Sequence, residues 1–389
     1  MNFNISKKTA FGFIILLGMV SLFADITYEG GRSIIGSYLA LLGASGTIVG
    51  IVVGFGELVG YALRLVFGYI ADKTKRYWLI TIVGYTINLF AIPLLGLVGR
   101  LEIAIFLIIL ERIGKAIRTP SRDMLLSSAT KEFGYGRGFG LHEALDQIGA
   151  ILGPLVMAVV LYFKSEYRIA FALLFIPALL ALMVLIKAKF FYPQPMFLEK
   201  ISVFSDTKGL TKTFWIYLVG MIFVAAGYVD FPLIAYHFKK VSLIPDNLIP
   251  TFYSIAMGTD ALAAILLGRL FDRKGFSILV ISVFISLFFV PLVFLKKSYL
   301  VLCGMLLWGI GIGAQESIMR AAIANMISID KRAFAYGVFS AFYGLFWFLG
   351  SAVAGKFYDI SIFALVIFSV LMQLFSIPFF ILAKNQLKK

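Results

Sequence analysis

Ionisable side chains interrupt the apolar segments of this chain at spacings that favour charge or proton chemistry. In the first apolar segment, Asp25, Glu29 and Arg32 follow one another at intervals of four and three residues, which places them on one helix face. A charge near the bilayer centre costs about 2.5 to 3.5 kcal/mol, so it must face protein or water. We expect Glu29 and Arg32 to neutralise each other and Asp25 to be the freer acid. The alternative is an ion network that only locks helices together.

A proton carrier must be a carboxylate or imidazole whose pKa is brought toward neutrality by burial. A cation that approaches it then favours release of the proton. On the sequence, four acids satisfy the burial condition, and we predict them as proton-coupling candidates: Asp25, Glu29, Glu143 and Asp146. For His142, close to the predicted entry of its helix, we favour a structural or gating role.

Further ionisable residues lie in or next to apolar segments and are predicted to be charge partners or to line a substrate cavity. They are Arg32, Glu57, Arg64, Arg112, Lys115, Asp230, Glu316 and Arg320. The stretch 111–123 is the most cationic; it favours either a collar that attracts an anionic solute or gate salt bridges to Asp72, Glu143 or Asp123. Charges are fewer in the second half, which predicts that coupling chemistry lies in the first.

Two of these second-half charges carry a local prediction. Asp230 precedes Phe231 and Pro232, where a broken helix would free backbone carbonyls. Glu316 and Arg320 are spaced i, i+4 with the acid first, which favours a simple local ion pair.

The composition shows what must position these residues. Of 389 residues, 61% are hydrophobic and 14% charged, where a soluble domain carries about 25% charged residues. A soluble globular protein is therefore excluded, and at about 20 residues per crossing the chain supplies on the order of twelve helices. The apolar run from Phe11 to Phe23 lacks a cleavage site after it and is predicted to be a retained span.

Hydropathy predicts an all-α membrane protein with twelve transmembrane helices in two bundles of six. The predicted spans are 11–38, 47–69, 78–98, 103–118, 138–162, 167–187, 213–236, 250–270, 276–295, 299–322, 334–356 and 360–383. The predicted domains are an N-terminal bundle over 1–187, a cytoplasmic linker over 188–212 and a C-terminal bundle over 213–389. Most of the 35 Lys and Arg residues fall in alternate loops, which predicts that both termini are cytoplasmic.

The two halves carry similar loops 200 positions apart. The segment from Gly68 to Lys73, Gly-Tyr-Ile-Ala-Asp-Lys, returns as Gly-Arg-Leu-Phe-Asp-Arg from Gly268 to Arg273, and Tyr28 returns as Tyr228. Duplication with preserved register is the simplest account. Two parallel repeats of six helices place a substrate site at their interface and allow rocking between two open states.

At these loops the chain resembles a major facilitator superfamily transporter, closest in character to the drug:proton antiporter members. The family's loop signature is Gly, three residues, Asp, a basic residue, one residue, Gly, then basic residues. The resemblance assigns gating roles to Gly68, Asp72, Lys73, Arg76, Gly268, Asp272 and Arg273. Lys75 replaces the second Gly in the first copy, whereas the second copy keeps Gly275. We expect Asp72 and Asp272 to govern conformational switching and not solute affinity.

A stripe of small residues follows Asp146. Gly149, Gly153 and Pro154 are similar to the signature of the family's antiporters in that helix, although such spacing is also common in ordinary membrane packing. The resemblance favours export of a small organic solute or drug coupled to protons or another ion. Uptake or export of an anion or metal ion is the alternative within transport, and a non-transporting receptor is the alternative outside it.

Other classes are excluded or weakly supported. We find no phosphate-binding loop of the Gly-x-x-x-x-Gly-Lys type, no nucleophile and base spacing of an enzyme, and no basic tract for nucleic acid. With two His and one Cys we expect neither a metal site nor a cofactor, and Cys303 is predicted to be a buried small hydrophobe. We expect a monomer in the plasma membrane whose partners are a small-molecule substrate, a coupling ion and the lipid bilayer.

Overall fold

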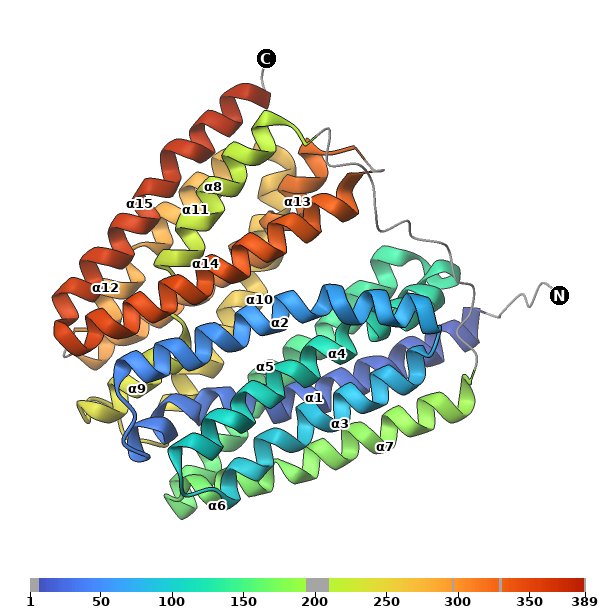
Figure 1. Ribbon diagram of the computed structural model, residues 1–389, viewed down its shortest axis with the longest axis horizontal. Coiled ribbons are helices and arrows are strands. Elements are labelled where there is room, and N and C mark those ends of the chain that lie inside the picture. Colours follow the sequence, from blue (N-terminus) through green and yellow to red (C-terminus); the bar gives the residue numbers. More distant parts are fainter. Residues whose placement is uncertain (1–6, 194–209, 296, 329–330, 388–389) are drawn as a thin grey trace. The chain divides into compact units, whose positions relative to one another are not determined.

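The computed structural model describes residues 7–193, 210–295, 297–328 and 331–387, and its regular elements are helices (Figure 1). In chain order they are α1 (Lys7–Leu41), α2 (Gly46–Thr74), α3 (Tyr77–Leu94), η1 (Leu95–Leu97), α4 (Leu101–Phe133), α5 (Tyr135–Lys164), α6 (Tyr167–Leu173), α7 (Phe175–Phe191), α8 (Lys212–Gly227), α9 (Phe231–Lys240), α10 (Ile249–Lys274), α11 (Phe276–Ser286), α12 (Phe289–Val293), α13 (Ser298–Met326), α14 (Arg332–Ile360) and α15 (Ile362–Leu387). The prediction of an all-helical membrane protein is confirmed. Residues 194–209 of the predicted linker lie outside the described part.

Eleven segments among the described residues are long and apolar enough to span a membrane. The predicted twelfth, 103–118, lies in α4, which is 33 residues long, carries Pro120 inside it and continues to Phe133. The charged stretch that follows the predicted span is therefore helical. Beside the proline, the Thr119 hydroxyl donates to the Lys115 carbonyl at 2.6 Å, a local side-chain bond within the helix.

Three predicted spans are each divided into two helices. The break between α8 and α9, next to Asp230, was predicted; those between α6 and α7 and between α11 and α12 were not, since 167–187 and 276–295 were predicted to be continuous. In each case a proline lies in the first turn of the second helix: Pro177, Pro232 and Pro291. Proline removes a backbone donor and clashes with the preceding turn, so a helix ends just before it.

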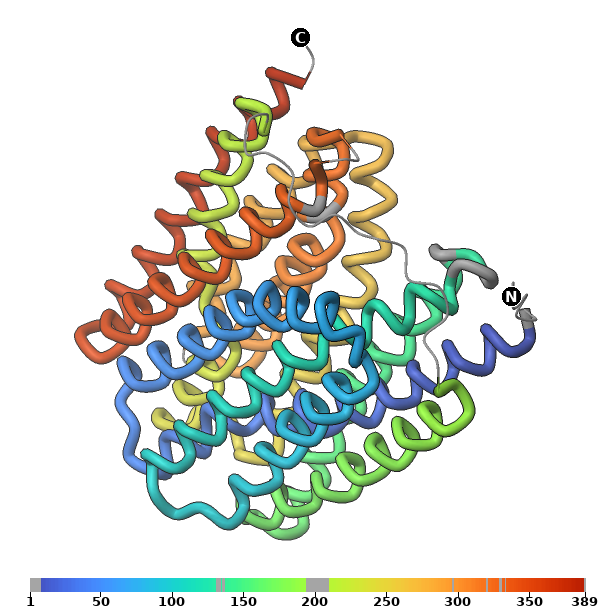
Figure 2. The backbone as a smooth tube through the Cα atoms, turned by 45° about the vertical axis from the view of Figure 1, so that its right-hand side comes forward, coloured from blue at the N-terminus to red at the C-terminus, as the bar shows by residue number. Residues whose placement is uncertain are grey.

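Contacts divide the chain into two compact units, which we describe separately. Unit 1 comprises 1–34 and 59–200, and unit 2 comprises 35–58 and 201–389, so α1 and α2 contribute to both. In unit 1, α3 packs extensively on α4 and also contacts α7, as Figures 1 and 2 show. In unit 2, α10 packs on α13, and α8 packs on α14 and α15. The predicted division at 187 and 213 concerns the two repeats and stays a prediction.

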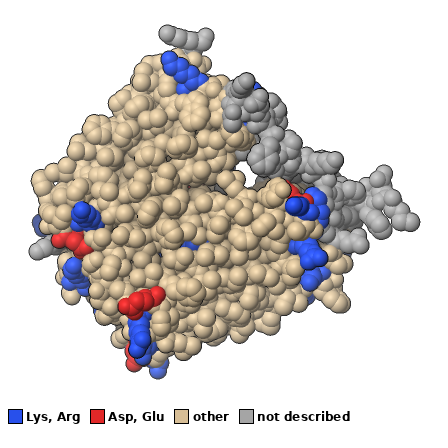
Figure 3. Space-filling view, viewed as in Figure 1, with Lys and Arg blue, Asp and Glu red and all other residues tan. Residues whose placement is uncertain are grey.

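Many large hydrophobic side chains are exposed on the described surface, as a lipid environment requires. In the face shown in Figure 3, acidic and basic side chains occupy a few small places and most of the described surface belongs to other residues. Cys303 is exposed, so the prediction that it is buried is wrong. Its apolar neighbours in the sequence do not indicate burial here, because a membrane helix is also apolar on its outer face.

Candidate functional site

Close packing of α5 on α1 brings two acids together in unit 1. A Cβ atom on Gly149 would meet the Leu22 carbonyl and the Asp25 side chain, and one on Gly153 would meet the Ile26 carbonyl and Gly30. The predicted small-residue stripe therefore serves close helix packing. Because Asp146 lies one turn before Gly149, its side chain reaches the neighbourhood of Asp25.

The carboxyl groups of Asp25 and Asp146 lie within hydrogen-bonding reach of each other. Because an ionised carboxylate only accepts hydrogen bonds, a bond between them needs a proton on one of the two. The Ser21 hydroxyl also bonds Asp146 and lies 3.5 Å from Arg122 Nη1. The sequence predicted both acids individually, but not that they form a pair.

Three cations of α4 and two tyrosines surround this carboxyl pair. Lys115 and Arg118 attract Asp25, and Arg122 attracts Asp146. The Lys115 ammonium lies 4.0 Å from the centre of the Tyr28 ring, and the Arg118 guanidinium lies 4.3 Å from that of Tyr85, both within cation–π distance. Arg122 also pairs with Asp123 at 2.7 Å, one of the three acids considered as salt-bridge partners for this stretch, and the gating role stays a prediction.

Arg118 is the functional candidate that the sequence analysis missed. Only 2% of it is exposed, and its Nε and Nη1 atoms have no hydrogen-bond partner in the described structure. We placed Arg118 at the end of a predicted span, where it would reach water. Because α4 continues past it, the side chain is buried instead. Glu111, Arg112, Lys115, Arg118 and Arg122 all belong to this one helix.

Arg112 forms its ion pair with its own neighbour. Arg112 Nε lies 3.1 Å from Glu111 Oε2, and Asn88 Nδ2 donates to Glu111 Oε1 at 2.7 Å. A Cβ atom on Gly114 would meet the Asn88 backbone, so α3 and α4 pack closely at this point. The sequence analysis did not predict Glu111 as a partner of Arg112, because adjacent residues of an ideal helix do not face each other.

The remaining predicted charges of the first half are spread over several places. Arg32 Nη1 lies 3.9 Å from Glu29 Oε1, as predicted. The Arg64 guanidinium lies 5.1 Å from the Tyr61 ring centre, and Glu57 is half-buried. Glu143 is exposed, not buried as we expected. His142 is buried, and its Nε2 atom has no partner in the described structure.

Unit 2 holds a buried network of aromatic and amide side chains together with Asp230. Asp230 Oδ1 accepts the Phe231 N–H at 2.8 Å and so caps α9, while Trp347 Nε1 lies 3.4 Å from Asp230 Oδ2. The break before α9 frees the Val229 carbonyl, which accepts a bond from Trp308 Nε1 at 3.0 Å. The freed carbonyl therefore bonds an aromatic side chain within the protein.

Two further residues of α13 and α14 complete this network. The Tyr343 hydroxyl donates to Gln315 Oε1 at 2.7 Å, and the Tyr228 ring lies 5.9 Å from that of Trp347. Glu316, by contrast, is exposed, and the Arg320 side chain lies outside the described part, so their predicted pair stays a prediction.

The repeated loops occupy matching places in the two units. Gly68 faces Pro120 of α4 and Gly268 faces Ser317 of α13, and a Cβ atom added to each glycine would lie 3.7 and 3.6 Å from these side chains. Lys75, which replaces the family glycine, has φ of 56°, and Gly275 in the second copy has φ of 59°. Lysine therefore has the positive φ that glycine has at the matching position of the other repeat, where ψ is −144°.

The acids and cations of these loops have different surroundings. Asp72 Oδ1 accepts the Tyr77 hydroxyl at 3.1 Å and is half-buried. Lys73 Nζ lies 5.9 Å from the Tyr69 ring centre. Arg76 precedes α3, and Arg76, Asp272 and Arg273 are exposed.

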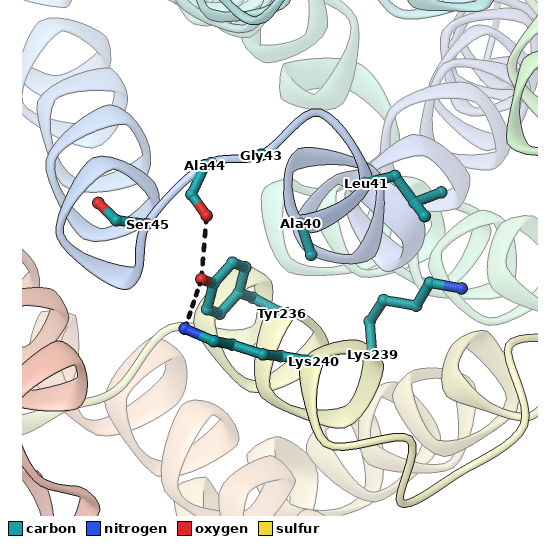
Figure 4. A pocket seen from close by; sticks show the side chains of 8 residues that line it. All are labelled: Ala40, Leu41, Gly43, Ala44, Ser45, Tyr236, Lys239 and Lys240. Carbon is teal, nitrogen blue, oxygen red and sulfur yellow. Dashed lines mark hydrogen bonds between the residues drawn. The ribbon is translucent and has the colours of Figure 1, made fainter.

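A cavity of about 460 Å³ opens in unit 2 between the α1–α2 loop and the end of α9 (Figure 4). The Tyr236 hydroxyl donates to the Ala44 carbonyl at 3.0 Å and accepts from Lys240 at 3.2 Å, while Lys239 points away and pairs with Asp246. Both lysines of this cavity are therefore engaged within the protein.

Beside this cavity, Asp359 of α14 caps the start of α2. Its carboxylate accepts the Gly46 and Thr47 N–H groups at 2.8 Å each and the Thr47 hydroxyl at 2.7 Å. The sequence analysis missed this contact, because the two segments are about 310 residues apart and no local pattern links them. Among the described residues, no group of three or more His, Cys, Asp or Glu side chains is arranged to hold a metal ion.

Comparisons with known proteins agree with this architecture. The chain is 39% identical over 376 residues to an uncharacterized protein of Mycobacterium tuberculosis, covering 95% of this chain and 92% of that one. It is 28% identical over 362 residues to an uncharacterized MFS-type transporter of Methanocaldococcus jannaschii, covering 90% and 89%. The crystal structure of a nucleoside transporter, NupG, superposes with a TM-score of 0.76 at 15% identity over 96% of this chain and 99% of that one. The family model of the Major Facilitator Superfamily matches residues 9–351. The chain therefore belongs to the major facilitator superfamily of membrane transporters.

Proposed function

We propose that this protein is a proton-coupled secondary transporter of a small organic solute in the plasma membrane. The observation that supports it is the proximity of the Asp25 and Asp146 carboxyl groups, which lets the pair share one proton between two helices. Lys115, Arg118 and Arg122 stand beside the pair and favour its ionised state. A proton held between such groups can be lost or gained as the surrounding helices rearrange.

Efflux of the solute in exchange for protons is our first candidate for the direction of transport. It is supported by the similarity of Gly149, Gly153 and Pro154 to the antiporter signature and by their place in the packing of α5 against α1. Cotransport of an anion with the proton is the second candidate, and the buried Arg118 favours it. The neutral network around Tyr343 and Gln315 is proposed to contact the apolar part of the solute.

Transport in proteoliposomes tests the proton site. Growth of expressing and deletion cells on a broad panel of toxic compounds supplies a solute, whose transport is then measured with an imposed pH gradient. Asp25→Asn and Asp146→Asn should each reduce accumulation of the solute against its gradient more than tenfold. Exchange of solute across the membrane should stay measurable. Glu29→Gln tests the other predicted acid of α1. Glu102→Gln, at an exposed acid in the first turn of α4, is the matched control and should keep accumulation. Full accumulation in both Asn variants would refute the assignment.

The repeated loops are proposed to govern the change of conformation. Asp72→Asn should slow turnover several-fold with nearly unchanged solute affinity, since its carboxylate contacts Tyr77 and the loop, and Asp272→Asn is the parallel variant in unit 2. Initial rates and half-saturation concentrations measured together separate the two effects. A large loss of affinity at normal turnover would contradict this role.

A further inference from the structure

Unsatisfied polar atoms gather around Arg118 in the interior of unit 1. The Nε and Nη1 atoms of Arg118, the Tyr85 hydroxyl, the Ser121 hydroxyl and the Thr81 hydroxyl are all buried and have no hydrogen-bond partner in the described structure. Ser121 lies one turn along α4 from Arg118, and Thr81 lies one turn before Tyr85 on α3. The four side chains therefore belong to one location between α3 and α4.

Unsatisfied polar atoms around Arg118 destabilise the folded protein unless a ligand supplies their hydrogen-bond partners. A buried polar atom without a partner costs about 1 to 3 kcal/mol, and more when it is charged. Packing holds Arg118 at this point, because a Cβ atom on Gly84 would meet the Arg118 backbone and because its guanidinium stacks on Tyr85. The side chain is thus fixed in a place where two of its nitrogens need acceptors from outside the protein chain.

We propose that Arg118 binds the carboxylate of a monoanionic organic solute, with the hydroxyls of Tyr85 and Ser121 beside it. This inference rests on the proposed proton-coupled transport and names the class of its solute. A guanidinium binds a carboxylate through paired, charge-assisted hydrogen bonds. The acceptors that Arg118 lacks are those that a carboxylate supplies.

The charges around Arg118 favour one negative charge over two. Asp25 attracts Arg118, and the pair that Asp25 forms with Asp146 keeps one negative charge when it holds a single proton. A dianion such as phosphate would add two further charges beside that carboxylate. Lys115 and Arg122 lie near the pair as well, so three cations of α4 supply enough positive charge for one anion.

The same geometry sets the sign of the coupling. An anion bound to Arg118 offsets the positive charge that otherwise stabilises ionised Asp25. The bound anion therefore favours a proton on the carboxyl pair. By linkage, a proton on the pair favours the anion equally. Solute and proton therefore bind together, which corresponds to cotransport in the same direction. A solute that is exchanged for protons would instead compete with the proton for binding.

Thermal melting of the purified full-length protein in detergent tests the site without knowledge of the natural solute. The probes are acetate, butyrate and benzoate, their neutral amides acetamide, butyramide and benzamide, and chloride and phosphate as inorganic anions. We expect at least one carboxylate to raise the melting temperature in a saturable manner while its amide does not. Arg118→Gln should abolish the shift, and Arg118→Lys, which keeps the charge, should retain it with at least fivefold weaker apparent affinity. Arg100→Gln, at an exposed arginine of the same unit just before α4, is the matched control and should bind as the wild type does.

Three results would overturn the inference: no carboxylate stabilises the wild type, the amides act equally, or inorganic anions alone act. A full carboxylate shift in Arg118→Gln would also contradict it. Where Arg118→Gln does not fold, the Arg118→Lys comparison decides the same question.

Proton uptake on addition of the bound carboxylate, measured in weak buffer, should be present in the wild type and lost in Asp146→Asn. If the wild-type protein binds no carboxylate but transports a neutral solute in response to a pH gradient, this inference is refuted and the proposed function stands.

Discussion

In unit 1, Gly153 of α5 packs on Ile26 of α1, and in unit 2, Gly350 of α14 packs on Ala226 of α8. Gly68 facing Pro120 and Gly268 facing Ser317 give the matching register for α4 and α13. The two units thus align residue by residue through their closest helix contacts. This alignment allows the polar positions of one unit to be compared with those of the other.

At matching positions the two units have side chains of different chemistry. Counting along the aligned helices, Asp25 corresponds to Ala225, Asp146 to Tyr343 and Arg118 to Gln315. Unit 1 therefore has a carboxyl pair beside a buried arginine, where unit 2 has a neutral hydrogen bond between a tyrosine and an amide. The same close helix packing occurs in both units, whereas carboxyl groups occur at these positions only in unit 1.

Removal of the Arg112 charge should have the largest effect on stability. Arg112→Ala leaves Glu111 buried without its cation, and breaking a buried pair in this way costs about 3 to 5 kcal/mol. The matching residue of unit 2 is Gly309, so this unit has no pair to lose. Thermal melting in detergent should show poor folding of the single variant and substantial recovery in Arg112→Ala with Glu111→Gln.

Two outcomes would change this part of the comparison. Normal expression with lost solute binding and no rescue by a second change would make Arg112 a solute ligand. A normal melt with intact transport would refute both roles.

Asp359 should have the next largest effect, this time in unit 2. Asp359→Ala removes three hydrogen bonds at the start of α2, including two to backbone N–H groups, and loss of a helix cap costs about 1 to 2 kcal/mol. The matching position in unit 1 is Tyr162, which is exposed, so Tyr162→Ala is a suitable control. Hydrogen exchange at the Gly46 and Thr47 amides should accelerate in Asp359→Ala alone, and unchanged exchange there would contradict the capping role.

A smaller effect on stability is expected when the hydrogen bond between Tyr343 and Gln315 in unit 2 is removed. Tyr343→Phe removes the donor to Gln315 and should lower the free energy of unfolding by about 1 kcal/mol. The pH dependence of transport should stay that of the wild type, because neither side chain titrates near neutral pH. A shifted pH profile would show that proton coupling also involves unit 2 and would remove the main contrast between the units.

The smallest effect is expected in the repeated loops. Lys75→Gly should stabilise the protein by up to about 1 kcal/mol, because a non-glycine residue in the left-handed region carries a steric cost that glycine does not. Gly275→Lys in the other repeat should destabilise it, because its φ of 59° and ψ of −144° strongly favour glycine. Melting temperatures that move in the same direction in both variants would show that the two loops are not equivalent.

Much of the fold follows from local features of the sequence. Hydropathy located the spans to within a few residues, and the proline after Asp230 correctly predicted the break before α9. The breaks before α7 and α12 carried the same proline signal, at Pro177 and Pro291, but each lies inside a strongly apolar run for which hydropathy predicts a continuous span. The length of α4 was underestimated because its charges end the hydropathy signal before the helix ends.

The sequence by itself determined which residues carry charge in an apolar chain and that the loops of the two halves repeat, because residue type, hydropathy and spacing are local properties. Only the tertiary structure decided that Asp25 meets Asp146, that Arg112 pairs with Glu111 and that Asp359 caps α2. Each of these contacts depends on which helices are neighbours and on how each helix is rotated about its axis. That rotation is set by where glycines let two backbones approach, as at Gly149 and Gly153, and the approach involves residues more than a hundred positions apart.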